Sequence, residues 1–456
     1  MERAPRRASG LASVLADDPP RLVAYELLRA VSGQQAYANL ALPPMIRERA
    51  LSARDAGLAT ELGYGTLRAQ GTLDEIVAAC VDRDLSTVDG EVLDLLRLGA
   101  YQALRTRIPP HAAVATTVDL ARATGNGRAA GFVNAVLRRV VASDWDAWTD
   151  RLAEGASPLR RLALRTAHPE WIAAAFADAL GGDLDETSAA LAADDARPQT
   201  HLVAWPGLIE RDALAVASGG EPGPWSPYAV RMSGGDPAAL DAIRRGRAGV
   251  QDEGSQLCAL ALAEAPIDGR DERWLDLCAG PGGKTALLAA IGAGRGAKIT
   301  ADELHPHRAE LVRRVTAPWN VEVRVGDART LPGIEGGYDR VLLDAPCTGL
   351  GALRRRPEAR WRRTTDDLAD LVALQRQLLA AALRLCRPGG VVAYVTCSPH
   401  PAETLQIVDG HELIDARPAF PAAMPLGDGP TVQLWPHRHG TDAMFCALIA
   451  GRHPSS

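Results

Sequence analysis

The stretch Leu-Asp-Leu-Cys-Ala-Gly-Pro-Gly-Gly-Lys-Thr at residues 275–285 constrains the fold of this chain more than any other segment. An apolar run ends at Leu277, and apolar residues with helical spacing follow from Ala286. The segment therefore predicts a strand, a glycine turn and a helix beginning near Lys284. Glycine lets the backbone turn sharply and approach a ligand closely, because it has no Cβ atom. The first turn of the helix then offers free N–H groups to a polar or anionic ligand.

Two common nucleotide-binding loops do not match this turn. A phosphate-binding P-loop needs a glycine where this chain has Cys278. A dinucleotide-binding loop needs a glycine where it has Thr285. The turn therefore predicts a ligand site of another kind, and the residues downstream decide which one.

The composition is that of an ordinary globular protein. The chain has 456 residues, of which 47% are hydrophobic and 23% charged, so two or three domains with large cores are expected. No apolar run reaches about 18 residues, so no membrane span is expected. No apolar segment follows the first residues as in a signal peptide. Seven cysteines, scattered and odd in number, favour reduced thiols in a cytoplasmic protein.

Changes in residue pattern divide the chain into four parts. We expect a flexible tail, an all-α domain, a connector with a small α+β subdomain, and an α/β domain, at residues 1–18, 19–145, 146–249 and 250–452 respectively. In the all-α part, Asp89 is expected to cap the helix that carries Val92 and Leu95.

The all-α part resembles a known RNA-binding fold. The stretches that carry the likeness are Arg21–Leu28, Leu96–Leu104 and Phe132–Arg139. Their order is similar to that of the corresponding segments in the antitermination factor NusB, so the resemblance implies an RNA-binding domain. A helical bundle that serves only for packing is the alternative.

After residue 250, strand and helix patterns alternate. The expected strands are 273–278, 297–301, 321–325, 340–344, 391–396 and 444–449. A long amphipathic helix is expected at 366–385. This alternation predicts a Rossmann-like parallel sheet with helices on both faces, and ligands then bind at the carboxyl ends of its strands.

Chemically useful residues follow several of these strands. Glu303 comes at the end of the second strand, and Asp327 follows the third. The turn Asp344-Ala-Pro-Cys347 follows the fourth strand, and the turn Thr396-Cys397-Ser398 follows the fifth. One acid after a strand is commonly a helix cap, but three acids in the same topological position favour a shared ligand site.

These turns together resemble those of the S-adenosylmethionine-dependent RNA cytosine-C5 methyltransferases. The likeness covers residues 250–450 and is specific, because few families place a Pro-Cys turn and a Thr-Cys turn at neighbouring strand ends. With a NusB-like domain in front, the chain is similar to the RsmB type (also called Sun or Fmu), which modifies small-subunit ribosomal RNA. The expected activity is transfer of a methyl group to C5 of a cytosine in 16S ribosomal RNA.

The resemblance assigns a role to each turn cysteine. Cys397 is the expected nucleophile, whose thiolate adds to C6 of the cytosine so that C5 can attack a methyl sulfonium. Cys347 is expected to assist product release, and Asp344 to hydrogen-bond the cytosine edge. A free thiol has a pKa of about 8.5, so Cys397 needs a neighbouring cation or helix N-terminus to form a thiolate. Two buried structural thiols are the alternative.

The resemblance also implies how S-adenosylmethionine binds. The glycine turn would hold the methionine end, Glu303 the ribose hydroxyls, Asp327 the adenine end, and Asp344 the region near the sulfonium. Asp302 remains an alternative to Glu303, which is preferred because it lies five residues before Arg308. The turn residues in this set are Cys278, Ala279, Gly280, Pro281, Gly282, Gly283 and Lys284. No metal is expected, because no pair of cysteines has zinc-ligand spacing.

RNA is the expected partner of a monomeric chain, although the net charge of −6 does not by itself indicate a nucleic acid. A basic run with an interleaved tryptophan follows the Asp-Ala-Pro-Cys turn, and such side chains suit phosphates and unstacked bases. The expected RNA contacts are Arg354, Arg355, Arg356, Arg360, Trp361 and Arg363. A solvated helix face is the alternative.

Other functions compete with this interpretation. A non-catalytic RNA-binding factor of ribosome assembly would not need the two turn cysteines. An amino-group methyltransferase would need an Asn/Asp-Pro-Pro-aromatic turn where this chain has Asp-Ala-Pro-Cys. Another substrate, such as transfer RNA, is compatible with the catalytic part alone.

Overall fold

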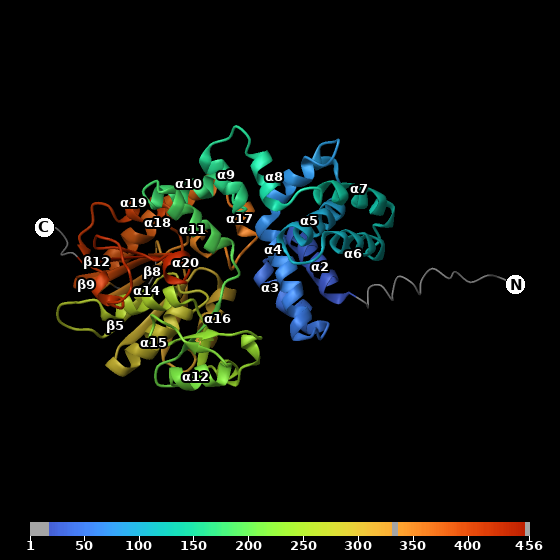
Figure 1. The fold of residues 1–456 in the computed structure, drawn as a ribbon. Helices are drawn as coiled ribbons and strands as arrows, with labels where there is room; N and C mark the ends of the chain where they lie inside the picture. Colours follow the sequence, from blue (N-terminus) through green and yellow to red (C-terminus); the bar gives the residue numbers. More distant parts are fainter. Residues whose placement is uncertain (1–17, 331–335, 452–456) are drawn as a thin grey trace. The chain divides into compact units, whose positions relative to one another are not determined.

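A computed structural model describes residues 18–330 and 336–451 of the chain. The predicted flexible tail lies outside the described residues, except for Asp18. The chain forms two compact units (Figure 1). The helical unit comprises the residues up to 177, together with 182–195 and 353–363. The sheet unit comprises residues 178–181, 196–352 and those from 364 onward.

The amino-terminal helices pack around one apolar core. Asp89 caps α5 as predicted, since its carboxylate accepts a hydrogen bond from the N–H of Glu91 at 2.8 Å. The buried residues of this core are mostly aliphatic, for example Leu27, Leu95 and Val133. Burial of one apolar face of each helix stabilises the bundle. The helices are α2 (Pro19–Gln34), α3 (Ala38–Glu48), α4 (Ala53–Ala78), α5 (Gly90–Arg105), α6 (Pro110–Ala123) and α7 (Ala130–Val140).

Further helices extend this unit past the predicted boundary at residue 145. Trp145 and Trp148 are buried, and their indole N–H groups donate to the carbonyls of Arg165 and Val140, at 3.0 and 2.8 Å. These contacts anchor the first part of the predicted connector to the helical core. The helices are α8 (Trp145–Leu152), α9 (Pro158–Arg165), α10 (Glu170–Ala179) and α11 (Leu184–Asp195).

Residues 353–363, called here the inserted segment, belong to the helical unit although they lie in the carboxyl-terminal half of the sequence. Arg360 in α17 (Ala359–Arg362) is fully buried. Its guanidinium forms ion pairs with Asp194 at 3.1 Å and with Asp195 at 3.2 Å. Because two acids at the end of α11 need this cation, a distant part of the sequence completes the helical unit.

The residues beside Arg360 also make hydrogen bonds inside the helical unit. The indole N–H of Trp361 donates to the carbonyl of Arg68 at 2.9 Å. Its ring occupies the space at Gly71, where a Cβ atom would lie 2.1 Å from Trp361 Cζ3. Arg362 donates to the carbonyl of Val31 at 2.7 Å. The inserted segment is therefore packed against α2 and α4.

The sheet unit contains a small antiparallel sheet with the strand order β2-β3-β1-β4. Its central strand β1 pairs with β3 on one side and β4 on the other. The sheet confirms the small α+β subdomain that we expected before residue 250. Its elements are β1 (Thr200–Ala204), α12 (Arg211–Ser218), β2 (Glu221–Pro222), β3 (Ala229–Met232), α13 (Asp241–Arg244) and β4 (Ala248–Val250).

The larger sheet has the strand order β10-β12-β9-β8-β5-β6-β7, with β11 paired to β12. Strands β5 to β9 run parallel, and each overlaps an expected strand. They are β5 (Arg273–Asp276), β6 (Lys298–Glu303), β7 (Val321–Val325), β8 (Tyr338–Asp344) and β9 (Cys386–Thr396).

The prediction of a parallel sheet is wrong at one edge, because β12 (Phe445–Ala450) runs antiparallel to β9. A parallel return needs a crossover, usually a helix long enough to cover the sheet. Between β9 and β12 the chain has only the short helices α19 (Leu405–Val408) and α20 (Pro436–His439). Strands β10 (Leu413–Ile414) and β11 (Val432–Gln433) pair with β12 instead.

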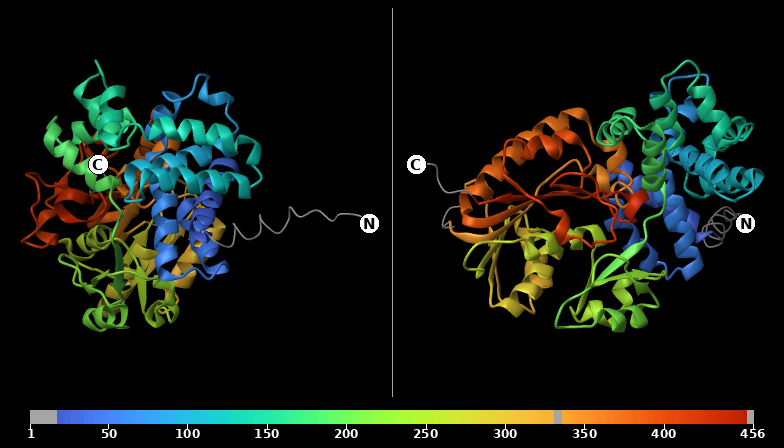
Figure 2. Two further views of the ribbon diagram at one scale, coloured as in Figure 1. Left: turned by 45° about the vertical axis from the view of Figure 1, so that its right-hand side comes forward. Right: turned by 60° about the vertical axis from the view of Figure 1, so that its left-hand side comes forward.

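Helices cover both faces of the large sheet (Figure 2). Alternate strand residues point to opposite faces. Trp274 and Leu342 pack with α14 and α15, whereas Leu275 and Val341 pack with α18. The covering helices are α14 (Glu253–Glu264), α15 (Gly283–Arg295), α16 (Pro306–Thr316) and α18 (Thr365–Leu385). The predicted long helix at 366–385 corresponds to α18.

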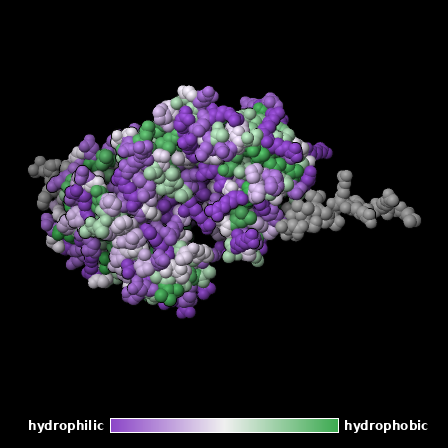
Figure 3. Space-filling model, in the orientation of Figure 1, coloured by the Kyte–Doolittle hydropathy of each residue, from purple (hydrophilic) through white to green (hydrophobic). Residues whose placement is uncertain are grey.

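No helix within residues 18–330 and 336–451 is long and apolar enough to cross a bilayer. On the face shown in Figure 3, hydrophobic residues are scattered among hydrophilic ones.

Replacing Arg360 with alanine is expected to destabilise the helical unit. The substitution removes the cation that Asp194 and Asp195 share, and breaking a buried ion pair costs about 3–5 kcal/mol. Urea unfolding followed by far-ultraviolet circular dichroism measures the loss. Arg356→Ala is the matched control, because Arg356 is exposed in the same segment and should change stability by about 0.5 kcal/mol or less. Equal effects of the two variants would contradict this structural role of Arg360.

Candidate active site

Three of the predicted strand ends meet at the carboxyl edge of the parallel sheet. Strand β5 lies beside β8, and β8 lies beside β9, so the glycine turn, Asp344 and Cys397 follow adjacent strands. The strand order reverses at β5, which has β6 on one side and β8 on the other. Ligands of open α/β sheets bind at such a switch point.

The two turn cysteines lie face to face. The Sγ atoms of Cys347 and Cys397 are 3.4 Å apart. Both residues are partly exposed, whereas Cys258 and Cys446 of the same unit are buried. The neighbouring Cys397 thiol and burial raise the pKa of Cys347, so Cys347 holds its proton. The pair therefore offers a protonated thiol beside a second thiol.

Lys284 is the cation of this site. Its ammonium forms an ion pair with the Asp344 carboxylate at 2.7 Å, and the two side chains are 10% and 30% exposed. Burial acts to lower the pKa of Lys284, but Asp344 outweighs burial and the pKa is raised. Lys284 also interacts electrostatically with Cys397. A nearby ammonium favours a thiolate over a thiol.

The glycine turn after β5 has little room for side chains. Gly282 has a φ of +107°, in the left-handed region that favours glycine. A Cβ atom there would lie 2.4 Å from Val315 Cγ1, and one at Gly280 would lie 2.4 Å from Glu303 Oε2. Helix α15 begins at Gly283, next to the predicted start at Lys284. The turn thus brings backbone N–H groups to the site without a Cβ atom in the way.

The two acids at the end of β6 have different surroundings. The carboxylate of Glu303 accepts hydrogen bonds from the N–H groups of Gly280 at 3.0 Å and His305 at 2.9 Å. Burial raises the pKa of Asp302 to about 7, and its buried Oδ2 has no hydrogen-bond partner among the described residues. Glu303 therefore supports the glycine turn, whereas Asp302 Oδ2 is available to accept a hydrogen bond from a ligand. Contact with a ribose stays a prediction for Glu303, with Asp302 as its alternative.

Two residues that the sequence analysis did not select also have buried polar atoms beside the turn. Thr285 Oγ1 donates to Asp276 Oδ2 at 2.7 Å, but Asp276 Oδ1 has no partner among the described residues. The Gln251 side chain lies beside Gly283. Its amide atoms Nε2 and Oε1 are buried and have no hydrogen-bond partner among the described residues. Asp276 is a carboxylate inside an apolar strand, and this signal was available in the sequence. Gln251 has no comparable signal.

These partnerless atoms suit the cofactor that the resemblance implies. Buried polar atoms normally have hydrogen-bond partners, so a group of them beside an open glycine turn indicates a ligand surface. The carboxylates of Asp276 and Asp302 can accept hydrogen bonds from an amino group or from ribose hydroxyls, and the Gln251 amide can donate and accept. The residues present therefore fit S-adenosylmethionine.

Asp327 follows β7 as predicted, but its carboxylate already has a partner. It forms an ion pair with Arg329 at 2.6 Å and accepts the N–H of the same residue at 3.0 Å. These contacts lower the pKa of Asp327. Contact with the adenine end of the cofactor stays a prediction.

The prediction of RNA contacts needs a correction for two of its residues. Arg354 and Arg360 are buried, and Trp361 donates its indole N–H inside the helical unit. Arg360 is buried because its guanidinium pairs with Asp194 and Asp195. A run of basic residues in the sequence does not reveal such a pairing. The burial of Arg354 and Arg360 argues against contact with RNA. Arg355, Arg356, Trp361 and Arg363 are partly or fully exposed, and RNA contact stays a prediction for them.

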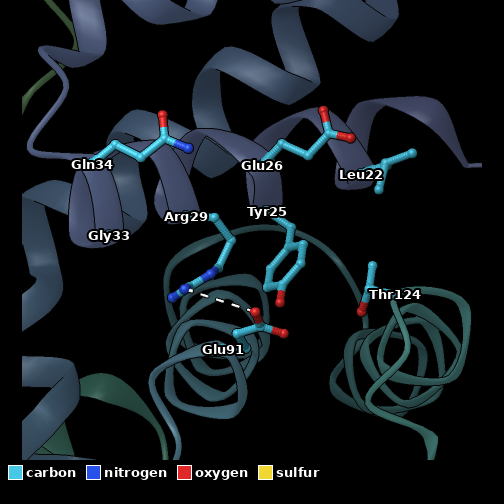
Figure 4. Close-up of a pocket in the computed structure, with 8 residues that line it drawn as sticks. All are labelled: Leu22, Tyr25, Glu26, Arg29, Gly33, Gln34, Glu91 and Thr124. Atoms are coloured by element: carbon cyan, nitrogen blue, oxygen red, sulfur yellow. Dashed lines mark ion pairs between the residues drawn. The ribbon is translucent and has the colours of Figure 1, made fainter.

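The helical unit has a pocket lined by residues of α2 together with Glu91 and Thr124 (Figure 4). Arg29 extends into it and forms ion pairs with Asp94 at 2.9 Å and Glu91 at 3.9 Å, so its charge is already neutralised. The lining residues are Leu22, Tyr25, Glu26, Arg29, Gly33, Gln34, Glu91 and Thr124. Within the part of the chain that the structure describes, no cluster of His, Cys, Asp and Glu side chains has the arrangement of a metal site.

Comparison with known proteins gives two family matches. The model of the 16S rRNA methyltransferase RsmB/F family matches residues 263–450, and the model of the NusB family matches residues 18–142. A protein of Mycobacterium tuberculosis that is named as a methyltransferase without a stated substrate is 54% identical over 95% of this chain and 96% of its own length. Ribosomal RNA small subunit methyltransferase B of Pseudomonas putida is 34% identical over 85% of this chain and 88% of its own length.

Solved structures share the fold. The crystal structure of PH0851 has a TM-score of 0.77 and 24% identity, and covers 95% of this chain and 99% of its own. The crystal structure of NSun6 from Pyrococcus horikoshii with SFG has a TM-score of 0.53 and 20% identity, and covers 62% of this chain and 99% of its own.

Replacing Asp276 with asparagine is expected to change how stability depends on pH. Burial raises the pKa of Asp276 from 3.8 to about 7. This carboxyl binds its proton more tightly in the folded state than in the unfolded state. The folded protein therefore loses stability as the pH rises through this interval. Asparagine cannot ionise, so the variant should gain stability relative to the wild type between pH 4 and pH 7. Melting temperatures across this interval measure the difference.

Asp327→Asn provides a control of opposite sign. Its lowered pKa means that the charged form stabilises the folded state, and this stability is lost as the pH falls through the pKa. The variant should therefore lose stability relative to the wild type at neutral pH. Parallel pH curves for Asp276→Asn and the wild type would contradict the raised pKa of Asp276.

Proposed function

We propose, since this chain belongs to the RsmB/F family of S-adenosylmethionine-dependent RNA cytosine-C5 methyltransferases, that it methylates C5 of a cytosine in 16S ribosomal RNA. The NusB match in the amino-terminal part supports RNA as the substrate. Relatives named as ribosomal RNA small subunit methyltransferase B support the 16S molecule in particular.

The sulfur pair is the observation that carries the proposed chemistry. A separation of 3.4 Å lets Cys347 and Cys397 act on the same base. C5 of cytosine is a poor nucleophile, so a thiol that adds to C6 divides one hard step into two easier ones. A second thiol is then useful for reversing that addition.

In the proposed reaction, Cys397 adds its sulfur to C6 of the cytosine, and the electron pair of the C5–C6 double bond becomes available at C5. S-adenosylmethionine supplies the methyl group when bound. The C5 proton then leaves, the C6–S bond breaks, and the aromatic ring is restored. Cys347 assists this release.

Lys284 and Asp344 prepare the site for these steps. The ammonium of Lys284 favours the thiolate of Cys397, with which it interacts electrostatically. The Asp344 carboxylate is partly exposed, so it can accept a hydrogen bond from the amino edge of the cytosine. Their ion pair places an ammonium and a carboxylate 2.7 Å apart in a half-buried place.

The remaining parts of the proposal concern the setting of the reaction. The target base has to leave its stack to reach the two thiols. Arg355, Arg356 and Arg363 are the proposed contacts with RNA phosphates and bases. We place the reaction in the cytoplasm, where the free thiols of this chain stay reduced, with a monomer as the active form.

The two cysteines should give opposite phenotypes when replaced with serine. Cys397→Ser removes the nucleophile and should lower methyl transfer by at least about a thousandfold. Cys347→Ser should leave adduct formation intact, slow product release and accumulate a covalent protein–RNA complex. Transfer of radiolabelled methyl groups measures the first effect, and denaturing gel electrophoresis the second. Cys386→Ser is the control, because this buried thiol lies at the start of β9, at the end of the strand away from Cys397. Methylation by Cys397→Ser at the wild-type rate would refute the covalent mechanism.

The substrate is tested in cells that lack this protein. Bisulfite sequencing of their small-subunit ribosomal RNA should show the loss of one 5-methylcytosine. The wild-type gene should restore the modification, while Cys397→Ser should not. Persistence of every 5-methylcytosine in 16S ribosomal RNA would refute the proposed substrate, and loss of one in transfer RNA would identify the alternative.

A further inference from the structure

Glu403 is a fully buried carboxylate near the two thiols, and no step of the proposed reaction uses it. It lies in the 3-10 turn Pro401–Glu403, shortly after the Thr-Cys-Ser turn. A buried carboxylate without hydrogen-bond donors would be strongly destabilising. Its partners therefore show what it holds in place.

Each oxygen of Glu403 has two donors. Oε1 accepts the backbone N–H of Thr348 at 2.8 Å and the side-chain N–H of Gln375 at 3.0 Å. Oε2 accepts the hydroxyl of Ser398 at 2.6 Å and the hydroxyl of Thr348. An ionised carboxylate is an acceptor only, and all four partners donate.

Three of these four donors come from the two cysteine turns. Thr348 directly follows Cys347, and Ser398 directly follows Cys397. One carboxylate thus connects the residues next to both sulfur atoms. The backbone of Glu403 is held as well, because the Tyr394 hydroxyl in β9 donates a hydrogen bond to the Glu403 carbonyl at 2.8 Å.

Helix α18 adds a third connection. The same Gln375 amide group that donates to Glu403 also donates to the carbonyl of Pro346 at 2.9 Å. Pro346 precedes Cys347, so the Cys347 turn is held on both sides. The N–H of Gly351 donates to the carbonyl of Cys397 at 2.9 Å and joins the two turns directly.

We propose that Glu403 is a positioning residue that sets the distance between the Cys347 and Cys397 sulfur atoms. The inference rests on the proposed function for its importance in catalysis, but the geometry of the thiol pair is a separate observable. Misplacement of reacting groups by about 1 Å can cost about a hundredfold in rate. A carboxylate that ties both turns together prevents such a displacement.

Glu403→Gln is the informative substitution, because it keeps the length of the side chain. The backbone N–H of Thr348 at Oε1 can only donate, so the amide oxygen of glutamine must take that place. The amide nitrogen then faces the Ser398 and Thr348 hydroxyls, which can rotate and accept. The network survives with weaker hydrogen bonds on the side that links the two turns, because charge-assisted bonds become neutral ones. Glu403→Ala leaves all four donors unpaired and tests folding instead.

The matched control is Asp339→Asn in the same sheet unit. Asp339 is also fully buried and accepts the N–H groups of Glu272 and Arg273, both at 2.7 Å. It lies near the start of β8, at the end of the strand away from Asp344 and the thiols. A loss of general stability should appear in both variants, whereas a loss of thiol geometry should appear only in Glu403→Gln.

The experiment measures thiol geometry and catalysis separately on the full chain. Phenylarsine oxide, which bonds two neighbouring thiols, reports the sulfur pair without RNA or cofactor, and Cys347→Ala gives the background from other thiols. Glu403→Gln should slow arsenical capture and lower kcat for methyl transfer about 10- to 100-fold, with KM for RNA nearly unchanged. Asp339→Asn should change the melting temperature but neither of these values.

The outcomes distinguish this inference from the proposed function. Wild-type arsenical capture and kcat in Glu403→Gln, with only a lower melting temperature, would reduce Glu403 to a structural role and overturn the inference. Slowed capture in a protein whose wild type methylates no RNA would refute the proposed function and still support the positioning of the thiols.

Discussion

The parallel pairing of β8 with β9 is the constraint on which the site depends. Their register places Asp344 opposite Val395, so the chain leaves both strands at the same edge of the sheet. Cys347 and Cys397 are 50 positions apart, and short turns of fixed length then bring their sulfur atoms to 3.4 Å. The glycine turn joins them because β5 is the other neighbour of β8. If β9 shifted by one residue relative to β8, the side chains of β9 would point to the opposite faces of the sheet. Such a shift would separate the two thiols.

Burial gives this edge of the sheet its electrostatic character. Lys284 and Asp344 form an ion pair at 2.7 Å, and removing either side chain would leave an uncompensated charge in a half-buried place. Asp276 Oδ1 and Asp302 Oδ2 have no hydrogen-bond partner among the described residues, and burial raises the pKa of each carboxyl to about 7. The site therefore combines one fixed ion pair with acids that are costly to ionise until a polar ligand group meets them.

Much of this site could be predicted from the sequence because its information is local. The strands have continuous apolar runs, the glycine turn has its own chemistry, and each turn cysteine follows a strand directly. The antiparallel strand β12 could not be predicted, since its direction depends on how a long irregular segment returns. The burial of Arg360 depends on acids more than 160 positions away, so a basic run looked like an RNA surface. Glu403 has no local signal either, because its donors come from three separate elements.

The course of the chain between the cysteines links the two units covalently. The Cys347 turn ends at residue 352, and the inserted segment begins at Leu353 within the helical unit. The chain then returns as α18, whose Gln375 holds the Pro346 carbonyl and the Glu403 carboxylate. Both ends of the inserted segment thus lead to residues that hold the thiol pair. Within the helical unit, Arg360 anchors the middle of this segment through its ion pairs with Asp194 and Asp195.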